Sequence, residues 1–191
     1  MKTRLTIASA LALALAACGS QDEATNAPAE DTAALPAPAA DAPDPATPQG
    51  FVDMAASSDM YEIEAGKLAQ DKGTSDAVKD FGAMMEKDHT ASSAKLKAAV
   101  AEGGAALSVP PRMLPKHQEQ LDALRNAGDR FDTVYAAQQL AAHQEALSLL
   151  QQQAESGTVQ SLKAFATETA PVVEGHLEHA RALGDTAGGA G

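Results

Sequence analysis

From about residue 50 onward, hydrophobic residues recur at spacings of three and four, which is the period of an α-helix. Four long segments show this pattern. One glycine separates the first segment from the second, and another separates the third from the fourth. Ser75 precedes the second segment, where a serine side chain can cap a helix. The pattern predicts long helices at residues 51–72, 76–102, 129–155 and 158–183, and a short helix at residues 115–126.

Each long helix carries its hydrophobic residues on one side. The stripe predicted for the third long helix consists of Phe131, Tyr135, Leu140, Leu147 and Leu150. The stripe predicted for the fourth consists of Val159, Leu162, Phe165, Val172, Val173, Leu177 and Ala180. Pro171 lies inside the fourth helix and is expected to kink it, because proline has no N–H for the carbonyl four residues earlier.

Four helices with one apolar stripe each bury these stripes best as a four-helix bundle. Short turns near residues 74 and 157 predict two antiparallel hairpins. The connection at residues 104–128 is long enough to run back along the bundle, and it carries the short helix. The predicted fold is therefore all-α: a ferritin-like four-helix bundle over residues 50–184 with a long crossover between the second and third long helices. A flexible tail is expected at residues 185–191.

The start of the chain has the pattern of a bacterial export signal. Lys2 and Arg4 precede a run of apolar and small residues from Leu5 to Ala17, which is typical of a signal peptide. At about thirteen residues the run is too short to span a bilayer as a helix. It ends in Leu15-Ala16-Ala17-Cys18-Gly19, which resembles the bacterial lipobox, and Cys18 is the only cysteine of the chain.

In lipobox signals the cysteine sulfur receives a diacylglycerol and the signal is cut just before that cysteine. The resemblance implies that residues 1–17 are removed and that acyl chains on Cys18 anchor the protein to a membrane. Gly19 and Ser20 follow Cys18, with no aspartate at the next position, which by analogy with enteric sorting favours the outer membrane, facing the periplasm. The alternative is an ordinary signal peptide, cut after Ala16 or Ala17, that leaves a soluble protein.

Residues 18–49 are expected to form a disordered tether. The segment consists mainly of Ala, Pro, Asp, Glu and Thr, with Leu35 as its one larger aliphatic residue, so it cannot bury enough apolar surface to fold. Its prolines favour a semi-extended spacer. The formal net charge of the chain is −12, which argues against nucleic acid as a partner. The membrane is the predicted partner, and the sequence identifies no protein partner.

Four ionisable side chains are predicted to face the interior, one from each long helix: Glu62, His89, His143 and His176. Counting the rise per residue puts the first three within a turn of the same level and His176 about one turn away. Three imidazoles and a carboxylate are suitable ligands for one divalent or redox metal ion such as zinc, iron or copper. The alternative is a polar core in which these groups satisfy one another through hydrogen bonds.

Glu86 would complete a Glu-x-x-His pair with His89, but its position is about a quarter turn away from the core face, so we leave it out of the site. No grouping of a nucleophile with a base, no phosphate loop and no dinucleotide fingerprint is present, so no catalytic residues are predicted. Four further ionisable residues are predicted to face solvent: Glu64, His117, Glu174 and His179.

Several runs of the helical region carry a resemblance to a known family: Phe51-Val52-Asp53-Met54 and its continuation to Ala69, Met85-Glu86-Lys87-Asp88-His89-Thr90, Phe131-Asp132-Thr133-Val134-Tyr135, Ala142-His143-Gln144 and Glu174-Gly175-His176-Leu177. As a set they resemble domain-of-unknown-function family 4142 over about residues 50–183. The resemblance implies a ferritin-like helical bundle of the bacterial envelope, with an Asp-His on the second helix and a histidine on the third and fourth. It implies no established activity.

The sequence leaves two functions open. The first is an envelope lipoprotein that binds a metal ion in the core of its helical domain. The second is a non-catalytic structural or interaction lipoprotein whose buried histidines and Glu62 form a hydrogen-bonded core. The full carboxylate set of ferritins is missing from the chain, so iron storage and di-iron oxidation are not implied.

Overall fold

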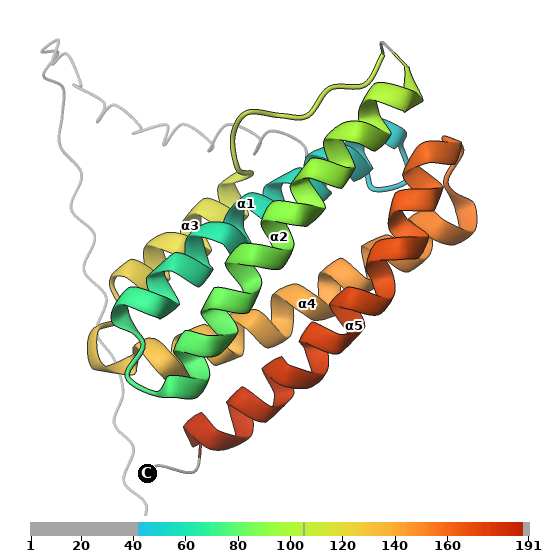
Figure 1. Ribbon diagram of the computed structural model, residues 1–191. Coiled ribbons are helices and arrows are strands. Elements are labelled where there is room, and N and C mark those ends of the chain that lie inside the picture. Colours follow the sequence, from blue (N-terminus) through green and yellow to red (C-terminus); the bar gives the residue numbers. More distant parts are fainter. Residues whose placement is uncertain (1–41, 105, 189–191) are drawn as a thin grey trace, which may run out of the picture. The chain divides into compact units, whose positions relative to one another are not determined.

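The computed structural model describes residues 42–104 and 106–188, and within these residues the backbone forms helices and no strand (Figure 1). The helices are α1 (Pro48–Lys72), α2 (Asp76–Gly103), α3 (Pro115–Arg125), α4 (Phe131–Ser156) and α5 (Gln160–Gly188). A short 3-10 turn, Gly128–Arg130, leads into α4. The predicted all-α class is confirmed, and so is the bundle packing of the helices.

The signal segment, Cys18, most of the tether and the last three residues lie outside the described residues. The predictions for residues 1–41 and 189–191 therefore stay predictions. In the part of the chain that the structure describes, no helix combines the length and the hydrophobicity needed to cross a membrane.

α1 begins at Pro48, before its predicted start at Phe51. The side chain of Thr47 accepts a hydrogen bond from the N–H of Gly50 at 3.0 Å. Proline is suited to the first turn of a helix, because the N–H that it lacks has no partner there. A capping threonine followed by proline is thus the local signal that sets this boundary.

The start of α2 agrees with the prediction, and α5 is longer than predicted. Ser75 caps α2 as predicted, since its hydroxyl accepts a hydrogen bond from the N–H of Val78 at 3.3 Å. α5 is unbroken at Pro171 and continues to Gly188, beyond the predicted end at Leu183. Residues 185–188, which were expected to belong to the flexible tail, are therefore helical.

The four long helices pack as two hairpins, α1 with α2 and α4 with α5 (Figure 1). α2 also packs on α5, and α1 on α4. The end of α2 meets the start of α5, where the Ser161 hydroxyl donates to the carbonyl oxygen of Ala99 at 2.7 Å. The chain must therefore return along the bundle between α2 and α4, and α3 lies in this connection against α1 and α4.

Two separate apolar clusters fill the interior. One contains Tyr61, Phe81 and Phe131, and the other contains Phe51 and Phe165 with their aliphatic neighbours. On each long helix a buried aspartate or histidine falls between the parts that contribute to these two clusters, namely Asp59, His89, His143 and His176. The core is thus divided by a polar layer near the middle of the bundle.

Some residues of the predicted stripes are not in the core. Val172 is 46% exposed, and Leu140 and Leu147 are only half-buried. Val173 occupies the core position that Val172 was predicted to share, because adjacent residues of a helix point about 100° apart. On α4, which packs on α1, α3 and α5, the buried surface extends to Ala136 and Gln139, two residues outside the predicted stripe.

Two glycines let α1 and α2 approach closely. A β-carbon at Gly66 would lie 2.5 Å from the carbonyl oxygen of Gly82. A β-carbon at Gly82 would lie 2.6 Å from the β-carbon of Ala69. Any larger residue at either position would force the helices apart, and this contact is about two turns from His89 along α2.

The crossover is held on α1 by a buried histidine. His117 was predicted to face solvent, but it is only 8% exposed. The hydroxyl of Ser57 lies 2.6 Å from Nδ1 of His117 and also accepts a hydrogen bond from the N–H of Leu114 at 2.7 Å. The His117 ring stacks on Tyr61, with ring centroids 5.5 Å apart.

His117 is neutral in this position. Burial, together with the charge of the neighbouring Lys116, lowers the pKa of His117 to about 4, so the ring is uncharged at neutral pH and shares a hydrogen bond with the Ser57 hydroxyl. The prediction of exposure was wrong because it treated the crossover as a surface connection. His117, Leu121 and Leu124 are in fact the buried stripe of α3, at spacings of four and three.

We expect Ser57→Ala to lower the free energy of unfolding by roughly 1–3 kcal/mol, because it leaves the Leu114 N–H and the His117 ring without their partner. Denaturant unfolding of the purified chain measures this change. Ser58→Ala is the control, since the neighbouring Ser58 is half-buried and its hydroxyl has no hydrogen bond among the described residues. Equal losses in the two variants would contradict this role of Ser57.

Candidate metal centre

The polar layer between the two apolar clusters is built from all four long helices. Its buried side chains are each 5% exposed or less. They are Asp59 and Glu62 from α1, His89 from α2, Gln139 and His143 from α4, and His176 from α5. The four side chains predicted to face the interior all belong to this layer.

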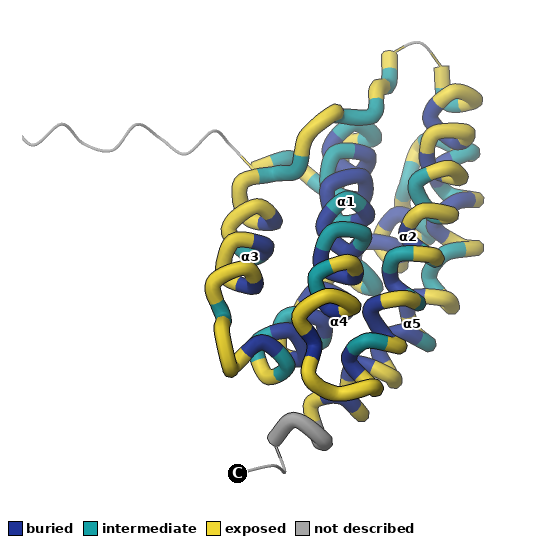
Figure 2. The backbone as a smooth tube through the Cα atoms, turned by 60° about the vertical axis from the view of Figure 1, so that its left-hand side comes forward, coloured by how far each residue is buried: buried dark blue, intermediate teal, exposed yellow. Residues whose placement is uncertain are grey.

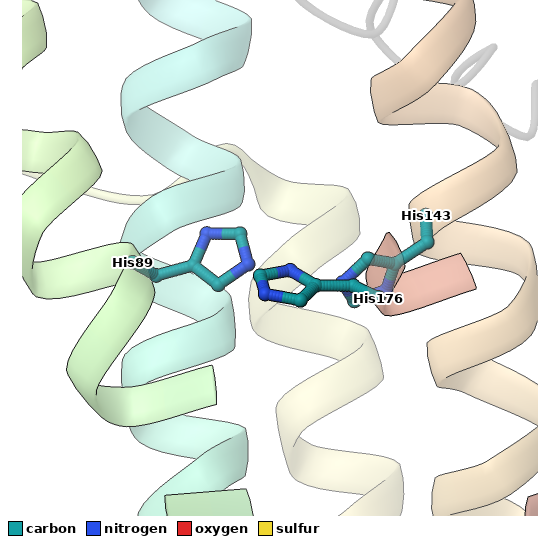
Figure 3. Close-up of side chains that lie close together, drawn as sticks. All are labelled: His89, His143 and His176. Carbon is teal, nitrogen blue, oxygen red and sulfur yellow. The ribbon is translucent and has the colours of Figure 1, made fainter. Parts of the chain in front are cut away.

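Three histidines converge in the layer, each from a different helix (Figure 3). The ring centroids of His89 and His143 are 5.8 Å apart, those of His89 and His176 are 5.6 Å apart, and those of His143 and His176 are 5.4 Å apart. One ring nitrogen from each histidine lies within 4.8 Å of the other two. This spacing is close enough for one metal ion to reach all three rings after a small inward movement.

His176 lies at the level of the other two histidines, so its predicted offset of one turn was wrong. Side chains of a helix lean toward the amino end of that helix. Because α4 and α5 are antiparallel, His143 leans away from the turn that joins them and His176 leans toward it. In addition, α5 begins at Gln160 rather than at residue 158, which brings His176 nearer to the turn.

The ring of His89 is held by a carboxylate of α1. Its Nδ1–H donates to Oδ1 of Asp59, and the two atoms are 2.8 Å apart. The hydroxyl of Ser93 donates to the other carboxylate oxygen at 3.3 Å. Asp59 is itself only 4% exposed, so this hydrogen bond is buried and fixes both the orientation and the tautomer of the ring.

The other two rings are held in the same manner. The Nδ1–H of His143 donates to the backbone carbonyl of Gln139 at 2.9 Å. The Nε2–H of His176 donates to Oδ2 of Asp88 at 3.1 Å. Since a carbonyl can only accept, His143 must carry its proton on Nδ1. Each ring thus has one nitrogen occupied by an outward hydrogen bond.

The remaining ring nitrogens have no partner. They are Nε2 of His89, Nε2 of His143 and Nδ1 of His176, and within residues 42–104 and 106–188 none of them makes a hydrogen bond although all are buried. A buried polar atom without a partner destabilises a protein by roughly 1–3 kcal/mol. A single cation between the three rings could bind all three of these nitrogens.

The protonation of the rings suits metal binding. Burial lowers the pKa of His143 to about 3, and burial also lowers the pKa of His176, against the hydrogen bond to Asp88. Burial acts to lower the pKa of His89 as well, but the hydrogen bond to Asp59 and the nearby charge of Glu62 outweigh it and raise that pKa. Two rings therefore present a free lone pair at neutral pH, and His89 must lose any added proton to bind a cation.

Glu62, the fourth residue predicted for the site, lies beside the three histidines. Its Oε2 accepts a hydrogen bond from the side chain of Gln139 at 2.7 Å, and its Oε1 is 3.9 Å from Nδ1 of His143. Nδ1 of His143 is the nitrogen that donates to the Gln139 carbonyl. Glu62 is absent from the converging group, and burial raises its pKa to about 7.

Asp59 and Asp88, the carboxylates that hold two of the rings, were not among the predicted site residues. Asp59 follows Ala55 by one helical turn and so shares the inner face, a phase that was visible in the sequence. Asp88 is half-buried next to His89 but serves His176 on another helix, and no pattern within α2 indicates this. Glu86 accepts a hydrogen bond from Gln70 at 2.8 Å on the outer side of the α1–α2 pair, which agrees with leaving it out.

One family matches the chain. The family described as a domain of unknown function, DUF4142, matches residues 33–183, which include every residue of the polar layer. No curated protein and no solved structure matches the chain.

In the absence of metal, we expect His143→Leu to keep or raise the free energy of unfolding, because leucine removes a buried nitrogen that has no partner. We expect His89→Leu to lower it by roughly 3–5 kcal/mol, because the buried Asp59 carboxylate then loses its ring partner. Denaturant unfolding with a chelator present distinguishes the two. A loss of several kcal/mol for His143→Leu would show that this histidine stabilises the fold without metal.

Proposed function

The chain belongs to the DUF4142 family, a domain of unknown function, and we propose that it binds one metal ion in the middle of its helical bundle. The ligands in this proposal are Nε2 of His89, Nε2 of His143 and Nδ1 of His176. Two observations carry it: these three buried nitrogens have no other partner among the described residues, and each of the three rings places a nitrogen within 4.8 Å of the other two. Zinc, iron and copper are the metals that imidazole ligands favour.

The outward hydrogen bonds support a metal site. Histidines that bind metals almost always donate their other N–H to a carboxylate or a carbonyl, which orients the ring and makes it more basic. Here the acceptors are Asp59, Asp88 and the Gln139 carbonyl. Zinc–nitrogen bonds of ~2.0–2.1 Å in a tetrahedral site would bring the nitrogens to about 3.4 Å from one another. The rings would move inward by about an ångström.

A hydrogen-bonded core without metal is supported less well. In such a core the rings would donate to one another or to Glu62, so that each nitrogen is satisfied. Within the described part of the chain no hydrogen bond joins two of the three histidines, and the contact of Glu62 with His143 is 3.9 Å. Instead, each ring has one nitrogen in a hydrogen bond and one nitrogen without a partner among the described residues.

The arrangement of the helices supports a ferritin-like four-helix bundle. Two antiparallel hairpins and one return connection that carries α3 match the topology of that class. A di-iron centre of the ferritin kind is not part of the proposal. Such a centre takes four carboxylates as ligands, whereas Asp59 and Asp88 here accept hydrogen bonds from the histidines.

We further propose that the domain is held at the bacterial outer membrane, facing the periplasm, by lipid on Cys18. This address is supported by the signal pattern of residues 1–17 and by the lipobox resemblance at Cys18. The tether that follows would separate the domain from the membrane surface. The metal site and the anchor are independent proposals, and each has its own test.

We expect the full-length chain, purified without a histidine tag and supplied with zinc, iron or copper, to retain close to one equivalent of metal after removal of the excess. His176→Ala should lose most of this metal, because it removes one of three ligands. His179→Ala is the matched control, since His179 lies one turn further on the same helix and is exposed. Elemental analysis measures the metal. A wild-type content well below one equivalent for all three metals would contradict the proposal.

We expect Cys18→Ser to move the protein out of the membrane fraction and to abolish incorporation of a labelled fatty acid, because serine has no thiol to accept the lipid. Ser20→Ala is the control and should leave both properties unchanged. Cell fractionation and fatty-acid labelling measure them. A Cys18→Ser protein that still carries the label would refute the anchor.

A further inference from the structure

A small cavity lined by residues of all four long helices adjoins the polar layer. Its volume is about 40 Å³, enough for about two or three atoms of the size of a water oxygen. His89 and His176 form part of its wall, and Glu62 does not. The rest of the wall is mostly apolar and includes Leu150 and Phe165.

The candidate route from the cavity to solvent runs between α2 and α5. A surface groove of about 210 Å³ shares four of its lining residues with the cavity. They are Asp88, Ser92, Thr169 and Val172. Val172, which is 46% exposed, marks the outer end of this route. This groove is therefore the candidate entrance for a molecule small enough for the cavity.

A metal ion on the three histidine nitrogens would keep an open coordination position. Zinc sites with three protein ligands characteristically hold water or a small exogenous molecule in the fourth position. The contact of Glu62 is with the outward nitrogen of His143, so this carboxylate is not placed to fill that position. The cavity touches two of the three ligand rings, and the open position is expected on that side.

The cavity wall holds a buried hydroxyl that is available to a ligand. The hydroxyl oxygen of Thr169 is buried and has no hydrogen-bond partner among the residues that the structure describes. A buried hydroxyl can donate a hydrogen bond to a molecule bound beside it, and this hydrogen bond stabilises the bound state. Thr169 lies on α5, two turns before His176, and lines both the cavity and the groove.

The charge of the residues around the cavity favours a neutral ligand at the open coordination position. Asp59 and Asp88 line the cavity and accept hydrogen bonds from His89 and His176. Two carboxylates already balance the charge of a divalent ion held by neutral imidazoles. Burying a further anion between apolar walls would leave an unbalanced charge in a medium of low dielectric constant. A neutral ligand avoids this penalty.

We propose that the metal centre binds a neutral diatomic molecule, nitric oxide or dioxygen, at its open position, with Thr169 donating a hydrogen bond to it. The molecule enters between α2 and α5, past Ser92 and Val172. This inference rests on the proposed metal site. The step is coordination only: the metal–ligand bond and the hydrogen bond form, and no electron or proton is transferred.

Nitric oxide added to the full-length chain loaded with iron(II), without oxygen, tests the inference. We expect an iron–nitrosyl signal in electron paramagnetic resonance and absorption. Thr169→Val, which keeps the size and removes the hydroxyl, should release nitric oxide about tenfold faster, because one hydrogen bond to the ligand is lost. Thr167→Val is the matched control: Thr167 is exposed, its hydroxyl donates to the Lys163 carbonyl, and release should be unchanged.

A second variant tests the route. Ser92→Leu should slow the association of nitric oxide and leave the metal content unchanged, because leucine fills the passage that groove and cavity share. Iron-loaded protein that gives no nitrosyl signal would overturn the inference and leave the proposed metal site standing. So would a chain that retains zinc and takes up no iron. A chain that retains no metal at all would overturn the proposed function itself.

Discussion

The hydrogen bonds that point outward from the buried imidazoles are the constraint on which the centre of this protein depends. A neutral imidazole has one donor and one acceptor nitrogen, so a donor fixed outward turns the acceptor inward. Asp59, Asp88 and the Gln139 carbonyl fix the three donors, and they come from α1, α2 and α4. The convergence of the rings therefore depends on the packing of all four long helices, and a shift of any one of them would disperse it.

This arrangement conflicts with the simplest way to stabilise a bundle. A continuous apolar core would be more stable than two clusters divided by a layer of carboxylates, imidazoles and an amide, several of whose atoms have no partner in the described part of the chain. Other contacts offset the loss. The close approach of α1 and α2 at Gly66 and Gly82, and the docking of the crossover through Ser57 and His117, hold the helices that carry the layer. Local departures from core packing of this kind are expected at functional sites.

The sequence predicted what depends on one helix at a time. The periodicity gave the helices and the inward phase of His89, His143 and His176, and the Ser75 cap fixed the start of α2. Features that depend on two elements together were missed or misplaced. The level of His176 follows from opposite side-chain leans on antiparallel helices, and the burial of His117 follows from α3 packing on α1. The role of Asp88 follows from a neighbour 88 positions away in the chain.

The topology also decides from which side the centre can be reached. The crossover places α3 over α1 and α4, and Figure 2 shows its buried face turned toward α1. The part of the layer contributed by α1 and α4 includes Glu62 and Gln139, and Tyr61 and Tyr135 are buried on the same two helices. The cavity is lined by residues of all four long helices, and the groove that shares residues with it is lined by α2 and α5. The single long connection thus covers α1 and α4, and the groove opens between the pair of helices that it leaves uncovered.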